Sequence, residues 1–145
     1  MLGKIGRSTL IPFRFEKSSH ITVLAKLSGE EVRLIVDTGA GGTCIDSNEV
    51  ERFNLRLSKR SQKGGGVGSS SMQIIGIAKH DLAVAGLDLS TYKLHALDLS
   101  HVNAGLVAAG VKAVAGVLGA DILFDRQAIV DYGRGHIILA EASRK

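Results

Sequence analysis

The sequence predicts one domain built mainly from β-strands, with two or three short helices. Apolar residues recur mostly at every second position, which is typical of strands with one buried face. The segments with a helical pattern are short and end close to glycines. At 145 residues the chain is long enough for a single domain with a proper core. Residues 1–145 are therefore expected to form one domain, with 1–18 and 141–145 as peripheral or flexible ends.

In the first half of the chain the expected strands are residues 20–27, 32–36 and 43–45. In the strand over 20–27, Ile21, Val23, Ala25 and Leu27 alternate with polar or small residues. A turn over residues 28–31 is expected to connect this strand to the next one in a hairpin. Ser47 is expected to cap a short helix that runs through residue 53.

The second half continues the pattern of short strands. Its expected strands are residues 72–78, 82–85, 92–99, 128–132 and 136–139, the last two forming a closing hairpin. Residues 102–109 are expected to be helical and to end at Gly110, and residues 121–126 are expected to form another helix. Between these helices, residues 114–118 form an apolar run that ends at Gly119.

Charge and composition exclude several classes of protein. The 18 basic and 14 acidic residues give a net charge of +4, but the basic residues are scattered, so nucleic acid is not an expected partner. Cys44 is the only cysteine and cannot form a disulfide within the chain. The five histidines lack metal-ligand spacing, so no metal is expected. The most apolar stretch, 106–124, contains Lys112 and Asp121 and is interpreted as core rather than a membrane span.

One stretch, LIVDTGAGGTCI from Leu34 to Ile45, carries a lone aspartate directly after an apolar strand. A carboxylate in such a place needs hydrogen-bond partners or water, because an unpaired buried charge is costly. In one interpretation the turn only ends the strand, and Asp37 accepts backbone hydrogen bonds. In the other, the turn presents Asp37 for chemistry, and the glycines allow backbone to come close.

The order apolar–apolar–Asp–Thr–Gly–Ala at this place resembles the active-site loop of the retroviral-type, or retropepsin-like, single-domain aspartic proteases. A glycine-rich segment follows at residues 64–68, where that family places its flap. Val117-Leu118-Gly119, followed by an expected helix, is similar to the second apolar–apolar–Gly loop of the family. The strands around residues 129–132 fit bacterial members, and the resemblance covers residues 21–139.

The resemblance implies a closed retropepsin-like (acid protease) barrel that forms a homodimer and acts as an aspartic endopeptidase on peptides or proteins, without metal or cofactor. Asp-Thr-Gly occurs once in the chain, so a pair of catalytic aspartates requires two copies. The implied catalytic residues are Asp37, Thr38 and Gly39. The implied substrate-binding residues are Ala40, Gly41, Gly66, Val67, Gly68, Val117, Leu118 and Gly119.

Two positions depart from the family pattern. Gly41 stands where retroviral members usually have an acidic residue, and Ala120 where they usually have an arginine. Asp121 and Arg126 are candidates for a local replacement of that pair. A catalytically idle dimerisation or peptide-binding module is therefore the main alternative to a protease.

The pI and the glycine run allow two further interpretations. A nucleotide or nucleic-acid binder has only the pI near 9.4 and the glycines of residues 64–68 in its favour. Those residues lack the Gly-Lys-Ser/Thr ending of a phosphate cradle, and they could equally form a surface loop without a role. No signal peptide is apparent at the amino terminus, so the cytoplasm is the default expectation for the compartment.

Overall fold

The structure is a computed structural model that describes residues 6–64 and 72–144 of the chain. These residues form two β-sheets, two α-helices and one 3-10 helix. The smaller sheet has the order β1-β13-β12, with bounds Ser8–Pro12, His136–Ala140 and Ile129–Asp131. The larger sheet follows the path β6-β7-β10-β5-β11-β4-β3-β8-β9, and β2 pairs with β3 outside this path.

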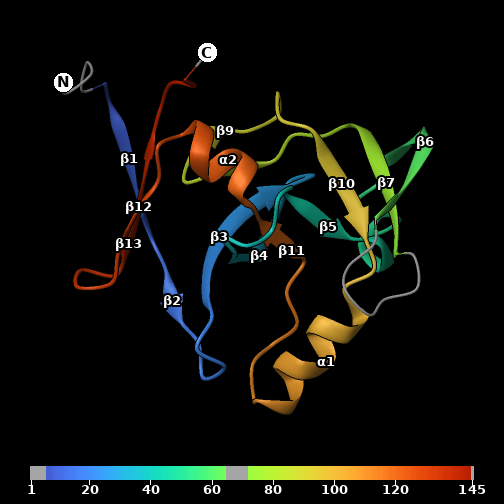
Figure 1. Cartoon of the computed structure of the whole chain (residues 1–145), viewed down its shortest axis with the longest axis horizontal. Coiled ribbons are helices and arrows are strands. Elements are labelled where there is room, and N and C mark those ends of the chain that lie inside the picture. The colour runs from blue at the N-terminus through green and yellow to red at the C-terminus, as the bar shows by residue number, and fades with distance from the viewer. Residues whose placement is uncertain (1–5, 65–71, 145) are drawn as a thin grey trace.

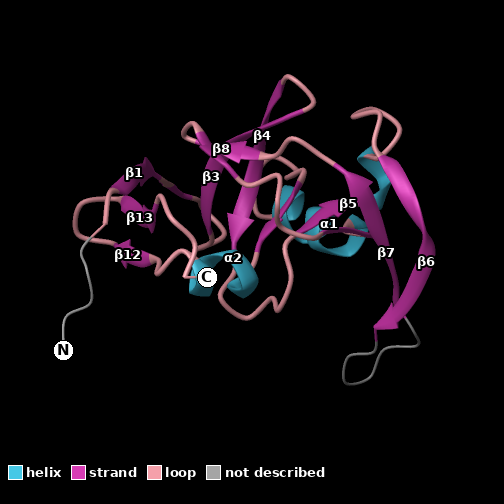
Figure 2. Cartoon of the chain, turned by 90° about the horizontal axis from the view of Figure 1, so that it is seen from above, coloured by secondary structure: helices cyan, strands magenta, loops and turns pink. Residues whose placement is uncertain are grey.

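The strands of the larger sheet are short, as the sequence predicts. Their bounds are β2 Arg14–Phe15, β3 Ile21–Leu27, β4 Glu30–Val36, β5 Cys44–Asp46, β6 Arg56–Gly64, β7 Met72–Lys79, β8 Ala83–Val84, β9 Leu87–Asp88, β10 Leu94–Leu97 and β11 Gly116–Leu118. The helices are η1 Ser47–Glu49, α1 Ser100–Ala108 and α2 Ala120–Asp125. Figures 1 and 2 both show the three-stranded sheet and the β6–β7 hairpin at opposite ends of the molecule, with α2 between them.

The central strands β4 and β11 are buried on both faces. They run parallel, and Val36 lies opposite Leu118 in a core that also includes most of β3. On the other face, Ile35 and Val117 pack in a second core, to which Leu106 of α1 contributes. Strands covered on both faces are continuous apolar runs rather than alternating ones, which explains the sequence Leu34-Ile35-Val36.

Two turns form as the sequence predicts. Ser28 and Gly29 join β3 to β4, and both have positive φ, 52° and 79°. Two central residues with positive φ are the requirement of a type I′ hairpin turn. Gly110 follows α1 with a φ of 81°, and the Val111 N–H donates to the carbonyl of Leu106 at 2.9 Å. This is the expected glycine stop of the helix over residues 102–109.

The predicted cap of the short helix at residue 47 is wrong. The N-cap is Asp46, whose carboxylate accepts a hydrogen bond from the N–H of Asn48, and the helix ends at Glu49. Asp46 is buried and also accepts hydrogen bonds from Leu99 N–H and from the Asn103 side chain. Asp and Ser are both favoured N-cap residues, so the local sequence does not distinguish Asp46 from Ser47.

The expected closed barrel is also not found. Among residues 6–64 and 72–144, the path of the larger sheet has two ends, β6 and β9, that do not pair with each other. Strands β1, β2, β6 and β9 were absent from the sequence prediction, and β11 was expected only as an apolar run. Strand β6 consists mostly of polar residues and lies at the edge of the sheet, where no alternating apolar face is required.

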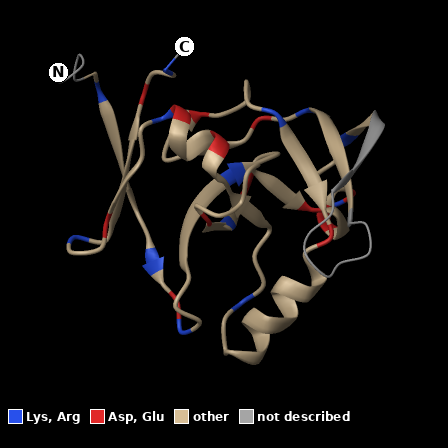
Figure 3. Cartoon of the chain, viewed as in Figure 1, with Lys and Arg blue, Asp and Glu red and all other residues tan. Residues whose placement is uncertain are grey.

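Neither α-helix of the described part of the chain has the length and apolar content needed to cross a membrane. Lys and Arg are spread along the ribbon of the described residues rather than gathered on one element (Figure 3).

Gly116 tests the close packing of the central strands. A Cβ at this position would lie 2.2 Å from the carbonyl oxygen of Cys44 on the neighbouring strand β5. We expect Gly116→Ala to lower the free energy of unfolding by about 3 kcal/mol, because overpacking forces the backbone apart. Urea unfolding measures this change. The matched control is Gly105→Ala in α1, where a Cβ meets nothing within 4 Å and the helix gains about 0.5 kcal/mol. Equal stability of both variants would contradict the prediction.

Candidate functional site

Asp37 is placed by the parallel pairing of β4 and β11. Both strands end at the same edge of the sheet, with Val36 opposite Leu118, so the residues that follow them, Asp37 and Gly119, are neighbours. The Asp37 N–H donates a hydrogen bond of 3.0 Å to the carbonyl of Leu118. The position of the aspartate is thus fixed by backbone contacts.

The turn that follows holds the carboxylate without burying it. The Gly39 N–H donates to Asp37 Oδ1 at 2.8 Å, and the Ala40 N–H donates to the Asp37 carbonyl at 3.2 Å. Residues 37–39 are all exposed in the single chain. The aspartate thus accepts the hydrogen bond of a strand-ending turn, and its carboxylate remains accessible in the single chain.

The second loop packs directly against the first. A Cβ on Gly119 would lie 2.8 Å from the carbonyl carbon and oxygen of Gly42 and 2.9 Å from the carbonyl oxygen of Ala40. The Ala120 N–H donates to that same Ala40 carbonyl at 2.7 Å. Only glycine fits at position 119 without moving the loop that carries Asp37.

Thr43 connects the two loops by its side chain, and the sequence analysis did not single it out for this role. Its buried hydroxyl accepts a hydrogen bond of 3.0 Å from the Gly119 N–H. The same hydroxyl donates to Asp121 Oδ1 on α2 at 2.8 Å. A hydroxyl that both accepts and donates in a buried place locks its neighbours in a single arrangement. No local pattern distinguishes it from an ordinary strand threonine.

An apolar pocket of about 440 Å³ opens beside Asp37. The predicted residues among its lining are Asp37, Ala40, Gly41 and Val117. Residues that the sequence analysis missed complete it: Gly42, Cys44, Ile74, His95, Leu97, Leu99 and Val102. Two of them, His95 and Leu97, alternate along β10 with the buried Leu94 and Ala96. That alternation identified the strand but not what its other face would line.

The remaining predicted residues lie elsewhere. Leu118 is fully buried in the main core, and Gly119 lies beneath the Asp37 loop, so neither lines this pocket. Thr38 is exposed, and its hydroxyl has no hydrogen-bond partner among the described residues of the single chain. Gly66, Val67 and Gly68 lie outside the described residues.

Cys44 contributes a neutral group to the pocket wall. Burial is the main cause that raises the pKa of its thiol to about 11, and the carboxylates of Asp46, Asp121 and Asp37 act in the same direction. A thiol with so high a pKa is not ionised near neutral pH and is a poor nucleophile. The Cys44 thiol is therefore a poor candidate for a reactive group at this pocket.

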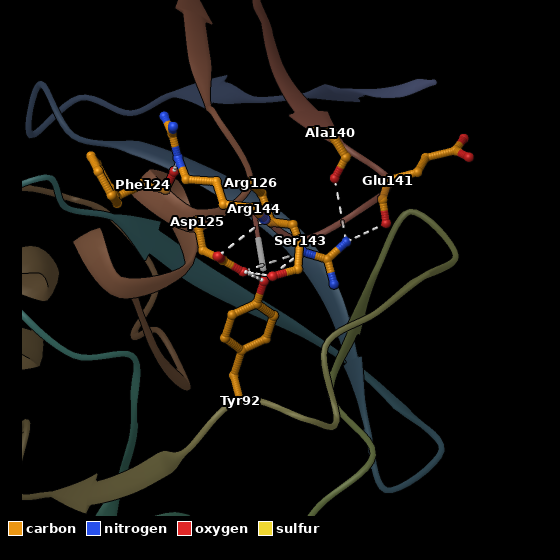
Figure 4. A network of polar contacts seen from close by, with 8 residues as sticks. All are labelled: Tyr92, Phe124, Asp125, Arg126, Ala140, Glu141, Ser143 and Arg144. Atoms are coloured by element: carbon orange, nitrogen blue, oxygen red, sulfur yellow. Dashed lines mark hydrogen bonds and ion pairs between the residues drawn. The ribbon is translucent and has the colours of Figure 1, made fainter. Parts of the chain in front are cut away.

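Asp121 and Arg126 do not form the pair that was expected to replace the acidic residue and the arginine missing at Gly41 and Ala120. Asp121 is bonded to Thr43, whereas Arg126 forms its ion pair with Asp125 at 4.0 Å. Figure 4 shows Arg126 among the polar groups that attach residues 140–144 to α2; it donates to Tyr92 and to the carbonyls of Ala140 and Glu141. In the described part of the chain Asp121 and Arg126 are therefore not partners.

Thr43 gives a test of the link between the loops. Thr43→Val keeps the shape but leaves the Gly119 N–H and the Asp121 carboxylate without their buried partner. We expect it to lower the free energy of unfolding by about 2 kcal/mol, as for other unsatisfied buried groups. Thr43→Ser keeps the hydroxyl and is expected to lose less than about half of that. Chemical denaturation compares the two variants, and equal losses would show that packing, rather than the hydroxyl, matters here.

Asp125 gives a test that depends on pH. Hydrogen bonds from Tyr92 and Ser143 are the main causes that lower the pKa of this carboxyl from its ordinary value of 3.8. A lowered pKa in the folded state stabilises the protein above the unfolded pKa, and this stability is lost as the pH falls through the folded value. Asp125→Asn is expected to cost about 1 kcal/mol at about pH 7 and less at about pH 3. Unfolding at both pH values measures it. The exposed control Glu51→Gln should change little at either pH; a loss for Asp125→Asn that did not depend on pH would refute the assignment.

Comparisons with known proteins give the family. The model of the gag-polyprotein putative aspartyl protease family matches residues 23–125, well over half of the chain and including both loops of the site. No curated protein sequence matches the chain.

Solved structures show the same fold at low sequence identity. A retropepsin-like aspartic protease from Rickettsia conorii aligns with a TM-score of 0.56 and 14% identity over 96% of each chain. The retroviral protease-like domain of Ddi1 from Leishmania major aligns with a TM-score of 0.56 and 16% identity over 84% of this chain and 89% of its own. EIAV protease, complexed with an inhibitor, aligns with a TM-score of 0.50 and 14% identity over 90% of this chain and 99% of its own. The chain thus has a retropepsin-like fold and belongs to the family of gag-polyprotein putative aspartyl proteases.

Proposed function

We propose that the protein is an aspartic endopeptidase that works as a homodimer, with Asp37 contributed by each copy. The observation that carries the proposal is the placement of Asp37. Its carboxylate is exposed, is held by the Gly39 N–H at 2.8 Å, and lies at an apolar pocket in a chain of an aspartic protease family.

Two copies are required by the chemistry. Two carboxylates about 3 Å apart share one proton, because both cannot easily be ionised together. The ionised carboxylate takes a proton from water, which attacks the peptide carbonyl, while the protonated one donates its proton to the carbonyl oxygen. The Asp-Thr-Gly motif occurs once in this chain, so a second copy supplies the second carboxylate. Because carboxylates activate the water, the mechanism requires no cofactor.

The neighbours of Asp37 support this use. Thr38 has an exposed hydroxyl without a partner among the described residues of the single chain, available for a hydrogen bond to the loop of the other copy. A Cβ on Gly39 would lie 3.2 Å from Asp37 Oδ1, so a side chain there would crowd the carboxylate. Gly119 supports the loop from beneath through its contacts with Ala40 and Gly42.

The substrate would lie across the site as an extended chain. An extended peptide binds mainly through its backbone hydrogen bonds, and pockets select alternate side chains. The pocket beside Asp37 offers apolar groups from β5, β7, β10 and β11. We infer that it takes an apolar side chain close to the cleaved bond.

Asp37→Asn tests catalysis. We expect this variant to cleave a diverse peptide mixture at least about 100-fold more slowly between about pH 3.5 and 7, because it cannot share and transfer the proton. The control is Asp88→Asn in the β8–β9 hairpin, which removes an exposed carboxylate away from the site. Equal rates for the wild type and Asp37→Asn would reject Asp37 as a catalytic residue.

Mixing wild type with excess Asp37→Asn tests the dimer. If each active site needs two copies, mixed dimers are inactive and the wild-type rate falls as the variant is added. Dilution of the wild type alone should lower its rate more than in proportion to concentration. A wild-type rate that the added variant leaves unchanged would reject the shared site. Tight peptide binding without cleavage by any form would identify the idle binding module instead.

A further inference from the structure

A second pocket of about 720 Å³ adjoins the apolar pocket. The two share Gly41, Gly42 and His95 in their walls. Away from these shared residues their chemistry differs, because charged and hydroxyl side chains, together with the Phe124 ring, line the second pocket. They come from α2, from the segment that leads into β10 and from the segment that follows β13. The second pocket is therefore within reach of a peptide whose side chain occupies the first.

The passage between the pockets is open because residues 41 and 42 have no side chains. A Cβ on Gly41 would meet nothing within 4 Å, and a Cβ on Gly42 would meet only His95 Nδ1, at 3.8 Å. Neither glycine has a positive φ, so the backbone does not require glycine at either place. A side chain at position 41 is thus tolerated by the fold and would project into the shared passage.

The carboxylates of the second pocket are already occupied. Asp121 Oδ1 accepts the Thr43 hydroxyl at 2.8 Å. Asp125 accepts hydrogen bonds from Tyr92, Ser143 and the Arg144 N–H, and it is paired with the buried Arg126 behind it (Figure 4). Both carboxylates thus have hydrogen-bond partners within the protein, and that of Asp125 is also paired with a cation.

The cations of the pocket retain free donors. Lys93 is exposed and has no hydrogen-bond or ion-pair partner among the described residues. Arg144 is held in place by its Nε, which donates to the Phe124 carbonyl at 2.7 Å, and by its guanidinium, which lies over the Phe124 ring at 4.4 Å. Its other guanidinium nitrogens have no partner in the described part of the chain. They keep the fork geometry that suits a carboxylate.

We propose that this second pocket is a substrate subsite for an acidic side chain, with Lys93 and Arg144 as its recognising groups and Gly41 as the residue that leaves it open. The inference rests on the proposed function of the Asp37 site. Side chains on one face of an extended peptide are two residues apart, at about 6.6 Å. The preferred substrate accordingly carries an apolar residue near the cleaved bond and a glutamate or aspartate two residues away.

The test compares peptides that differ only in charge. Each peptide has Leu at the cleaved bond and either Glu or Gln two residues away from it. The Glu or Gln is placed before the bond in one set and after it in another. Every peptide is made in a cleavable form and in a form whose peptide bond is reduced and cannot be cleaved. By calorimetry, we expect the non-cleavable Glu peptide to bind at least about threefold more tightly than the Gln peptide, a difference typical of exposed charge pairs. The kcat/KM of the cleavable Glu peptide should be higher by a similar factor.

Two sets of variants assign the preference to this pocket. The double variant Lys93→Met/Arg144→Met is expected to bring the Glu-to-Gln ratio to about one. Its control, Lys112→Met/Arg134→Met, removes the same charges at exposed positions outside the pocket and should keep the wild-type ratio. Gly41→Asp is expected to reverse the preference, whereas the neutral and equally large Gly41→Asn should not reverse it.

Each result decides one question. A ratio near one for the wild type, no binding of either peptide, or a preference that survives the double variant would overturn the subsite. Tighter binding of the non-cleavable Glu peptide without cleavage of its normal counterpart would support the subsite and reject the proposed protease activity. Cleavage of both peptides at equal rates would support the activity and reject the subsite.

Discussion

The burial of β4 and β11 on both faces is the constraint on which the site depends. Because Val36 and Leu118 pack in one core and Ile35 and Val117 in the other, neither strand can shift its register without moving apolar side chains away from both. The two strands therefore end together, and the loops that follow them meet. The hydrogen bond from the Asp37 N–H to the Leu118 carbonyl is the direct result.

Buried polar groups then fix the relative positions of loops and helices that the apolar cores do not hold. Thr43 ties the Asp37 loop to Gly119 and α2, and Asp46 ties β5 to the start of α1. Arg126 attaches the segment after β13 to α2. Each joins parts of the chain that are far apart in sequence, and each has its partners satisfied, as buried polar groups require. The walls of both pockets are positioned by such links as much as by packing.

The sequence predicted the elements that follow a local rule. The alternation in β3, the glycine stop at Gly110 and the Asp-Thr-Gly turn each depend on residues a few positions apart. It failed where partners are distant, because it missed the polar edge strand β6 and gave no role to Thr43 or His95. It also placed the helix cap at Ser47 rather than Asp46, where two adjacent residues are both suited to capping. The closed barrel, which the family resemblance implied, was wrong because that resemblance rests on loop motifs, and these do not determine which edge strands pair.

The thiol of Cys44 has a consequence for how the Asp37 pocket responds to alkali. Because its pKa is about 11, the thiol stays protonated and uncharged in mildly alkaline solution. Cys44 therefore adds no charge to the wall over that range. Reagents that react only with thiolates should accordingly modify Cys44 slowly in the folded protein.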